Sequence, residues 1–160
     1  MANYLLLLAP ALLATVYSAC QSGWRPYNGH CYRFQTDKES WTNARQMCLW
    51  HKSHLINIDD AAEQKWFHDQ ALTFNHTDGD NGFWLGGTNW NNDANWIWEI
   101  VHKPITYTNW DASQPNNRDN SELCMASIKL FDYRWSDEFC EWDVLQYVCE
   151  QSEGGDPIIG

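Results

Sequence analysis

Five side chains between residues 114 and 137 carry oxygens that could do binding chemistry. Gln114 and Asn116 flank a proline, Glu122 follows, and Ser136 and Asp137 come after a tryptophan further along the chain. Carboxamides offer a carbonyl oxygen and N–H donors, acids offer carboxylate oxygens, and serine offers a hydroxyl. Ca²⁺ takes about six to eight oxygen ligands and accepts carboxamides beside carboxylates. Side chains of these types can therefore bind a hard cation or hydrogen-bond a neutral polar ligand.

Composition and motifs favour binding over catalysis. The 160 residues contain 10 Lys and Arg against 21 Asp and Glu, a formal charge of −11. This balance disfavours nucleic acid, because basic residues hold the phosphate backbone. The nucleophile, zinc-protease and phosphate-loop motifs G-x-S-x-G, H-E-x-x-H and Gly-Lys-Ser do not occur. We expect a protein that is not an enzyme and that binds no nucleic acid.

The chain begins with an apolar segment typical of secretion. Residues 1–18 are rich in Leu, Ala and Val and end in small side chains, which predicts a signal peptide cleaved after Ser18. No later stretch reaches about 18 consecutive apolar residues, the length that a membrane-spanning helix requires. Residues 151–160 predict a flexible acidic tail. We expect a secreted, extracellular protein, and secretion makes the sequon Asn75-His76-Thr77 a candidate glycosylation site.

Six cysteines lie beyond the predicted signal peptide, at Cys20, Cys31, Cys48, Cys124, Cys140 and Cys149. An even number in an oxidising compartment predicts three disulfides and no free thiol. The number alone leaves many pairings open. A zinc site is the alternative, but zinc ligands are usually closely spaced and the chain has no C-x-x-C pair.

The elements that must position these residues fall into two halves. Residues 40–51 and 60–70 have apolar side chains at helical spacing, and a capping box at Asp60 opens the second helix. Asn28-Gly29 favours a two-residue hairpin turn between the first two cysteines. Short strands are expected at residues 83–87, 96–98, 123–128, 133–135 and 146–150. Two helices followed by short strands predict an α+β fold with a mainly antiparallel sheet.

The segment between these strands is long and polar. Residues 103–121 show no sustained period, and such stretches in a compact domain are usually functional loops or disorder. Eleven tryptophans either fill a core of short strands or present flat surfaces to sugars. We expect Trp96, Trp98, Trp110 and Trp135 to pack this loop region rather than to stack on a ligand.

Several motifs, in order, resemble the C-type lectin-like domain family. They are Trp84-Leu85-Gly86-Gly87, Gln114-Pro115-Asn116, Glu122 two residues before a cysteine, and Trp135-Ser136-Asp137. The cysteine placement is that of the family's long form, which has an extra amino-terminal pair. The resemblance covers roughly Cys20 to Glu150 and implies a C-type lectin-like domain over residues 19–150.

The resemblance implies a fold and a covalent framework. In this fold two helices flank short antiparallel sheets, and a long loop region carries a calcium site. The X-Pro bond of the loop is cis in family members, which would point Gln114 and Asn116 the same way. The implied disulfides are Cys20–Cys31, Cys48–Cys149 and Cys124–Cys140.

The resemblance also implies a mode of binding. In family members that bind sugar, oxygens of the X-Pro-X loop, a nearby Glu and a Trp-Asn-Asp strand hold one Ca²⁺, and two sugar hydroxyls complete its coordination. Carried over by position, the cofactor is Ca²⁺, the partners are glycans, and the metal ligands are Gln114, Asn116, Glu122 and Asp137. The carbohydrate-binding residues are these four with Ser136. A second calcium position would fall near Asn89, Asp93, Asn117 and Glu122, where an Asn-rich solvated loop is the other interpretation.

Two positions depart from the family pattern. Sugar-binding members mostly carry Glu-Pro-Asn (mannose type) or Gln-Pro-Asp (galactose type), whereas Gln114-Pro115-Asn116 has no acid. Only Glu122 and Asp137 then bring negative charge, so we expect weaker calcium binding. Ser136 stands in the Asn position, and its side chain is shorter. The choice between mannose-type and galactose-type sugars stays open.

The leading hypothesis is a secreted, calcium-dependent lectin that recognises microbial surface glycans in innate immunity. The alternative is a domain of this fold that binds a protein, ice or a mineral surface without sugar recognition. The missing acid at residues 114–116 and Ser136 favour the alternative, whereas Glu122 and Asp137 favour the lectin. With no odd cysteine, any homo-oligomer is expected to be non-covalent.

Overall fold

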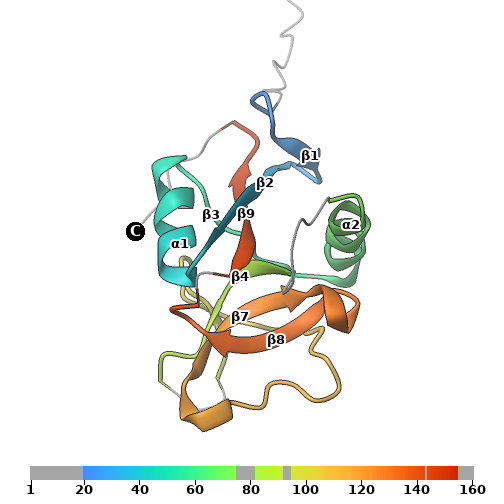
Figure 1. Cartoon of the computed structure of the whole chain (residues 1–160). Coiled ribbons are helices and arrows are strands. Elements are labelled where there is room, and N and C mark those ends of the chain that lie inside the picture. Colours follow the sequence, from blue (N-terminus) through green and yellow to red (C-terminus); the bar gives the residue numbers. More distant parts are fainter. Residues whose placement is uncertain (1–19, 75–81, 92–94, 143, 155–160) are drawn as a thin grey trace, which may run out of the picture.

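The computed structural model describes residues 20–74, 82–91, 95–142 and 144–154 (Figure 1). The expected signal peptide, the sequon at Asn75, Asp93 and the last six residues of the expected tail lie outside these ranges. None of the helices within them has the length and apolar character that crossing a membrane requires.

Two α-helices form in the described residues, both where the periodicity predicted them. Helix α1 (Trp41–Trp50) begins at Ser40, whose Oγ accepts the N–H of Asn43 at 3.2 Å. Helix α2 (Ala61–Leu72) begins at Asp60, whose carboxylate accepts two N–H groups of the first turn at 2.8 Å. These caps satisfy donors that the start of a helix leaves unpaired.

The described strands form one mixed sheet of nine strands. Its longest members are β2 (His30–Glu39), β9 (Leu145–Ser152) and β4 (Gly82–Thr88). Strand β9 is antiparallel to β2 but parallel to β4. The others are β1 (Arg25–Tyr27), β3 (His54–Leu55), β5 (Ile97–Trp98), β6 (Lys103–Pro104), β7 (Glu122–Ile128) and β8 (Arg134–Phe139). Figure 1 shows α1 and α2 on opposite sides of β2 and β9, so the predicted α+β class is confirmed.

Strand β9 continues two residues into the segment that was predicted to be a tail. Gln151 and Ser152 pair with the first two residues of β2, and the N–H of Glu153 donates to the Gly29 carbonyl at 2.8 Å. The predicted hairpin supplies these partners, with Asn28 and Gly29 at φ of 46° and 82° in its turn. The ordered domain therefore extends to at least residue 153 rather than ending at residue 150.

The three disulfides have the connectivity that the family resemblance implied. Cys20–Cys31 ties the amino-terminal segment to β2, and Cys48–Cys149 joins α1 to β9. Cys124–Cys140 joins β7 to the residue after β8. All six cysteines are therefore oxidised, and no thiolate is left for zinc.

Tryptophans pack the loop region, as predicted. Trp98 and Trp135 are 2% and 0% exposed. Trp110 lies edge-on to Trp135 with ring centroids 5.8 Å apart, and Trp96 lies 4.9 Å from Trp110. These four tryptophans form one cluster of edge-to-face contacts, against which the long polar loop packs.

Candidate functional site

The long loop is fastened to β8 just before its first candidate residues. The backbone of Trp135 bonds to Asn109 and Asp111, at 2.9 Å in each case. Beyond these bonds the Gln114–Pro115 peptide is cis, as the resemblance implied. Asn116 Nδ2 donates to Gln114 Oε1 at 2.7 Å, so the two carboxamides lie on the same side of the loop.

Asp137, on β8, binds the loop backbone through its carboxylate. It is 1% exposed, and its two carboxylate oxygens accept the backbone N–H groups of Asn116 at 2.9 Å and Asn117 at 2.6 Å. Hydrogen bonds to an ionised group are about twice as strong as neutral ones. Asp137 therefore organises the loop backbone as well as bringing one of the two expected charges.

Glu122, the first residue of β7, has a cationic partner inside the protein. It is 3% exposed; its Oε2 accepts the N–H of Arg118 at 2.9 Å, and its Oε1 lies 3.2 Å from Arg118 Nη2. Burial raises the pKa of Glu122, the Arg118 N–H opposes the rise, and the negative charge of Asp137 adds to it. The second expected charge is thus already paired with a guanidinium.

Arg118 is a site residue to which the sequence reasoning gave no role. Its neighbours Asn117, Asp119 and Asn120 have φ of 45°, 56° and 53°, a left-handed conformation that Asn and Asp tolerate better than most residues. This turn folds Arg118 back onto Glu122. An i, i+4 Arg–Glu spacing was the available signal, but it usually indicates a helical pair.

Glu138, to which the sequence analysis gave no role, lies at the hollow, whereas Ser136 is buried beside it. Ser136 is 0% exposed and donates to Glu138 Oε1 at 2.8 Å, so it presents no surface to a sugar. Burial raises the pKa of Glu138 to about 7, against the Ser136 hydrogen bond and with help from the charges of Glu122 and Asp137. Near neutral pH, Glu138 can therefore both donate and accept hydrogen bonds. The sequence signal for Glu138 was its position two residues after Ser136, which places both side chains on the same face of the strand.

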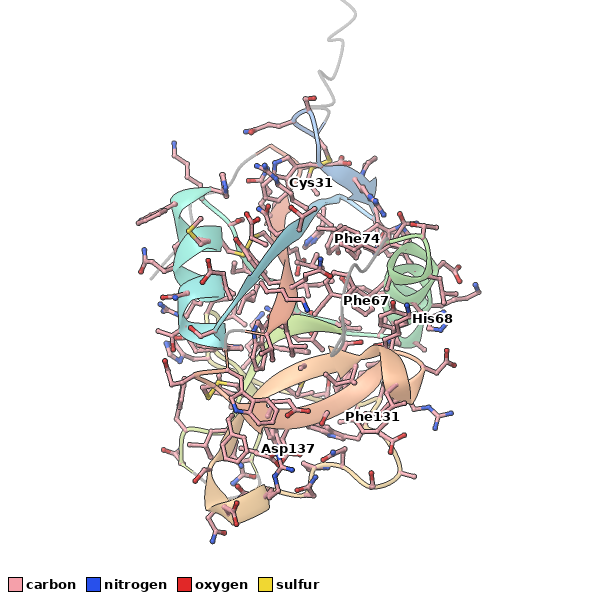
Figure 2. The ribbon with its side chains drawn as sticks, viewed as in Figure 1. Cys31, Phe67, His68, Phe74, Phe131 and Asp137 are labelled. Carbon is pink, nitrogen blue, oxygen red and sulfur yellow. A yellow bond between two sulfur atoms is a disulfide. The ribbon has the colours of Figure 1, made fainter. Side chains whose placement is uncertain are left out.

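The candidate groups border a surface hollow of about 650 Å³. Gln114, Asn116, Arg118, Glu122 and Glu138 line its polar end. The other end is lined by the turn between β7 and β8 and by Val144 and Leu145, while Trp142 lies against Arg118. Figure 2 labels Asp137 and Phe131 toward the two ends of this hairpin.

The oxygens gathered here fit a hard cation in kind. Gln114 and Asn116 offer carboxamide oxygens, while Glu122 and Asp137 offer carboxylates, which is a mixture that Ca²⁺ accepts. Both acids are buried, and a buried charge needs a partner. A cation bound here would have to share Glu122 with Arg118 or displace the guanidinium.

The second calcium position is described only in part. Asn89 is 6% exposed, and its N–H donates to the carbonyl of Leu123 at 2.9 Å, next to Glu122. Asp93 lies outside the described residues. The choice between a second ion and a solvated loop at this position stays open.

A buried acid, Glu150, and a half-buried one, Glu63, lie near the amino-terminal hairpin. Glu150 accepts from the N–H of Asn57 at 2.9 Å and lies 2.5 Å from Nδ1 of His30, and this hydrogen bond raises the pKa of His30. Tyr32 donates to Glu63 at 2.6 Å, and burial raises the pKa of Glu63 to about 7. None of these residues lines the surface hollow.

Known proteins resemble both the sequence and the fold. A family profile described as "Lectin C-type domain" matches residues 37–151. A perlucin-like protein of Mytilus galloprovincialis is 30% identical over 131 residues, which cover 81% of either chain.

Two solved structures place the fold. The carbohydrate-recognition domain of the mouse scavenger receptor C-type lectin has a TM-score of 0.74 and 28% identity, covering 84% of this chain and 99% of its own. A calcium-independent type II antifreeze protein has a TM-score of 0.70 and 24% identity, covering 84% and 95%. The second likeness is one of fold alone.

Proposed function

Because the chain belongs to the C-type lectin domain family, we propose that it is a secreted, calcium-dependent lectin that binds glycans of microbial surfaces. The family is a non-enzymatic binding fold, so the chain is not an enzyme. The convergence of the two carboxamides at 114 and 116 with Glu122 and Asp137, beside a hollow, carries the proposal.

Each residue has its own part in the proposed binding. Gln114, Asn116, Glu122 and Asp137 would hold the ion, which when bound supplies an electrophilic centre that orients sugar hydroxyls. The carboxamides donate N–H groups to those hydroxyls and Glu122 accepts from them. Asp137 keeps the loop in place through its two backbone bonds. Ser136 acts indirectly, by orienting Glu138 at the polar end of the hollow.

Binding to immobilised mannose, galactose and N-acetylglucosamine in calcium, followed by elution with a chelator, tests the proposal. We expect retention on at least one sugar and release by the chelator. Asp137→Asn should abolish retention, because it removes a charge and disturbs the loop. Asp69→Asn, on the outer face of α2, is the matched control and should leave retention unchanged. Retention that a chelator does not reverse would contradict the calcium mechanism.

Secretion and glycosylation are separate parts of the proposal. Expression in a secretory cell should yield a protein that begins after Ser18, as determined by amino-terminal sequencing. A glycosidase should change the mobility of this protein but not of the Asn75→Gln variant. An unprocessed intracellular chain would contradict the assignment to the extracellular space.

The second candidate is binding to a protein, ice or a mineral surface without sugar. One observation favours it: the guanidinium of Arg118 and the loop N–H groups already partner Glu122 and Asp137 within the protein. A glycan array in calcium, run beside a protein pull-down and assays on ice and mineral, separates the two. Binding that persists in chelator, without any glycan signal, would favour this candidate.

A further inference from the structure

The far end of the surface hollow is mainly apolar, although it opens to solvent. Its walls are Ile128, Leu130, Phe131, Val144 and Leu145, with Lys129 as the one charged side chain among them. Trp142 connects this end to the polar end, because its ring centroid lies 5.7 Å from the guanidinium carbon of Arg118. Leu130 is 87% exposed and Trp142 is 41% exposed. Large apolar side chains gathered at one concave surface usually mark a binding site.

The exposed position of Leu130 is built into the turn between β7 and β8. The N–H of Tyr133 bonds to the carbonyl of Ile128 at 2.9 Å, and that of Asp132 bonds to Lys129 at 3.0 Å. Asp132 and Tyr133 both have positive φ, at 54° and 57°. The turn is thus closed by its own hydrogen bonds and holds Leu130 over the hollow.

The apolar end is continuous with the polar end, since both line the same hollow. The polar end carries Gln114, Asn116 and Glu122, which the proposed function assigns to the sugar and its ion. About 650 Å³ is within the usual size range of small-molecule sites. A single ligand that fills the hollow would meet polar groups at one end and mainly apolar side chains at the other.

We propose that the hollow binds an amphiphilic glycoside, with the sugar at the polar end and an alkyl or aromatic aglycone that runs past Trp142 toward Leu130 and Phe131. The sugar end rests on the proposed function, whereas the aglycone end rests on the apolar walls alone. The ligand class is therefore glycolipid-like rather than a free polysaccharide. Burying even two methylene groups would raise affinity about tenfold.

Matched ligands test the proposal. Calorimetry in calcium compares methyl and octyl α-mannoside, and methyl and octyl β-galactoside, below the micelle-forming concentration. Tetraethylene glycol monooctyl ether supplies the same tail without a sugar. We expect the octyl glycoside of the preferred sugar to bind about tenfold or more tightly than its methyl partner, and the ether to bind more weakly than the octyl glycoside.

Matched variants locate the effect. Leu130→Ser and Trp142→Ala should each remove most of the octyl preference, and Leu130→Ser, which lies away from Arg118, should leave the methyl glycoside affinity unchanged. The controls are Leu72→Ser and Trp50→Ala, whose side chains are 59% and 71% exposed away from the hollow, and they should keep the preference. Sedimentation with and without octyl glycoside detects a second copy as the occupant.

Several results would overturn the proposal. They are equal affinity for octyl and methyl glycosides, octyl binding no tighter than that of the ether, an octyl preference that persists in Leu130→Ser and Trp142→Ala, or a dimer that the octyl glycoside dissociates. Failure of the proposed function gives a different pattern. Methyl glycosides then do not bind, while an octyl glycoside that outcompetes the ether and depends on Leu130 still supports the amphiphile site.

Discussion

Two groups of buried or half-buried acids lie toward opposite ends of the molecule and are satisfied in different ways. Glu150 and Glu63 are bonded by His30, Asn57 and Tyr32, which lie in parts of the chain far apart in sequence. At the other end, the acids of β7 and β8 are bonded by the backbone of one loop and by a single arginine, 55% exposed at its side chain. Only this second group borders the surface hollow.

The contrast shows that burial of a charge does not by itself identify a binding site. An acid such as Glu150 that links separate elements serves the fold, because removing it leaves donors in several elements unpaired. An acid such as Glu122, held by a neighbouring turn and an exposed cation, can exchange partners without unfolding the domain. The following predictions test this division.

The largest effect is expected from cutting the covalent link next to Glu150. Cys149→Ser opens the disulfide to Cys48, which joins residues 101 apart, and such a bond contributes about 2–5 kcal/mol. Folded protein should therefore be absent from the culture medium. Cys20→Ser frees only the segment before β1 and should be secreted. Immunoblots of cells and medium measure both, and equal secretion of wild type and Cys149→Ser would refute the prediction.

Neutralising one acid of each group compares them directly. Glu150→Gln should lower the free energy of unfolding by about 1–3 kcal/mol, because it weakens buried hydrogen bonds to a charged group. In chelator, Glu122→Gln should change stability by less than about 1 kcal/mol, since its partner Arg118 is half exposed. Urea denaturation measures both variants. Equal destabilisation would remove the distinction between the two groups.

Adding an acid to the loop should raise its calcium affinity and define its sugar preference. Gln114→Glu gives the third carboxylate that the mannose-type pattern carries, without changing side-chain length. Calcium affinity should rise about tenfold, because an anionic ligand replaces a carboxamide dipole, and sugar preference should move toward mannose. Gln35→Glu on β2 is the control for added charge. An unchanged calcium affinity in calorimetry would show that residue 114 is not a ligand.

The stability of the domain should fall as pH rises from about 5 to 8. The pKa of Glu63 is raised to about 7, so its protonated form is favoured in the folded state; that contribution is complete below the unfolded pKa and is lost as pH rises through about 7. The raised pKa values of His30 and Glu138 act in the same direction. Urea denaturation in chelator should show a loss on the order of 1 kcal/mol. Glu63→Gln, which does not titrate, should reduce the slope of the profile, and an identical slope in this variant would contradict the assignment.

The smallest effect is expected at the guanidinium that partners Glu122. Arg118→Gln removes a competitor for the carboxylate, and calcium affinity should rise about threefold, the scale of a half-exposed ion pair. Arg134→Gln, whose partner Asp111 lies 3.8 Å away, controls for the change in net charge. A gain of equal size in both variants would mean that only long-range charge matters.

Much of the fold was predictable because its signals are local. Periodic apolar residues, the caps at Ser40 and Asp60 and the Asn28-Gly29 turn all act within a few residues. The disulfide pairing came from the family resemblance and was confirmed. The end of β9 was misplaced because its partners at His30 and Cys31 are more than a hundred residues away in the sequence.

The site was predictable only as a set of residue types. Gln114, Asn116 and Asp137 do come together in one hydrogen-bonded unit. The place of Arg118 depends on successive left-handed residues, and the burial of Ser136 depends on which face of β8 packs inward. Neither is encoded in a short motif, so the sequence predicted neither the burial of Ser136 nor a role for Arg118.

The ladder between the start of β2 and the end of β9 also sets how the domain presents itself. Figure 1 shows β1 and these strand ends at the pole opposite the β7–β8 hairpin. A domain attached to a support through either end of the described residues would therefore present the hollow on the side away from that support. Copies held together at that pole, without covalent links, would present their hollows in the same direction. The effective concentration of the linked sites would then make the affinity of the assembly higher than that of one site. Such an array would bind a surface of repeated glycans with high avidity, even though a free sugar would dissociate quickly from each single site.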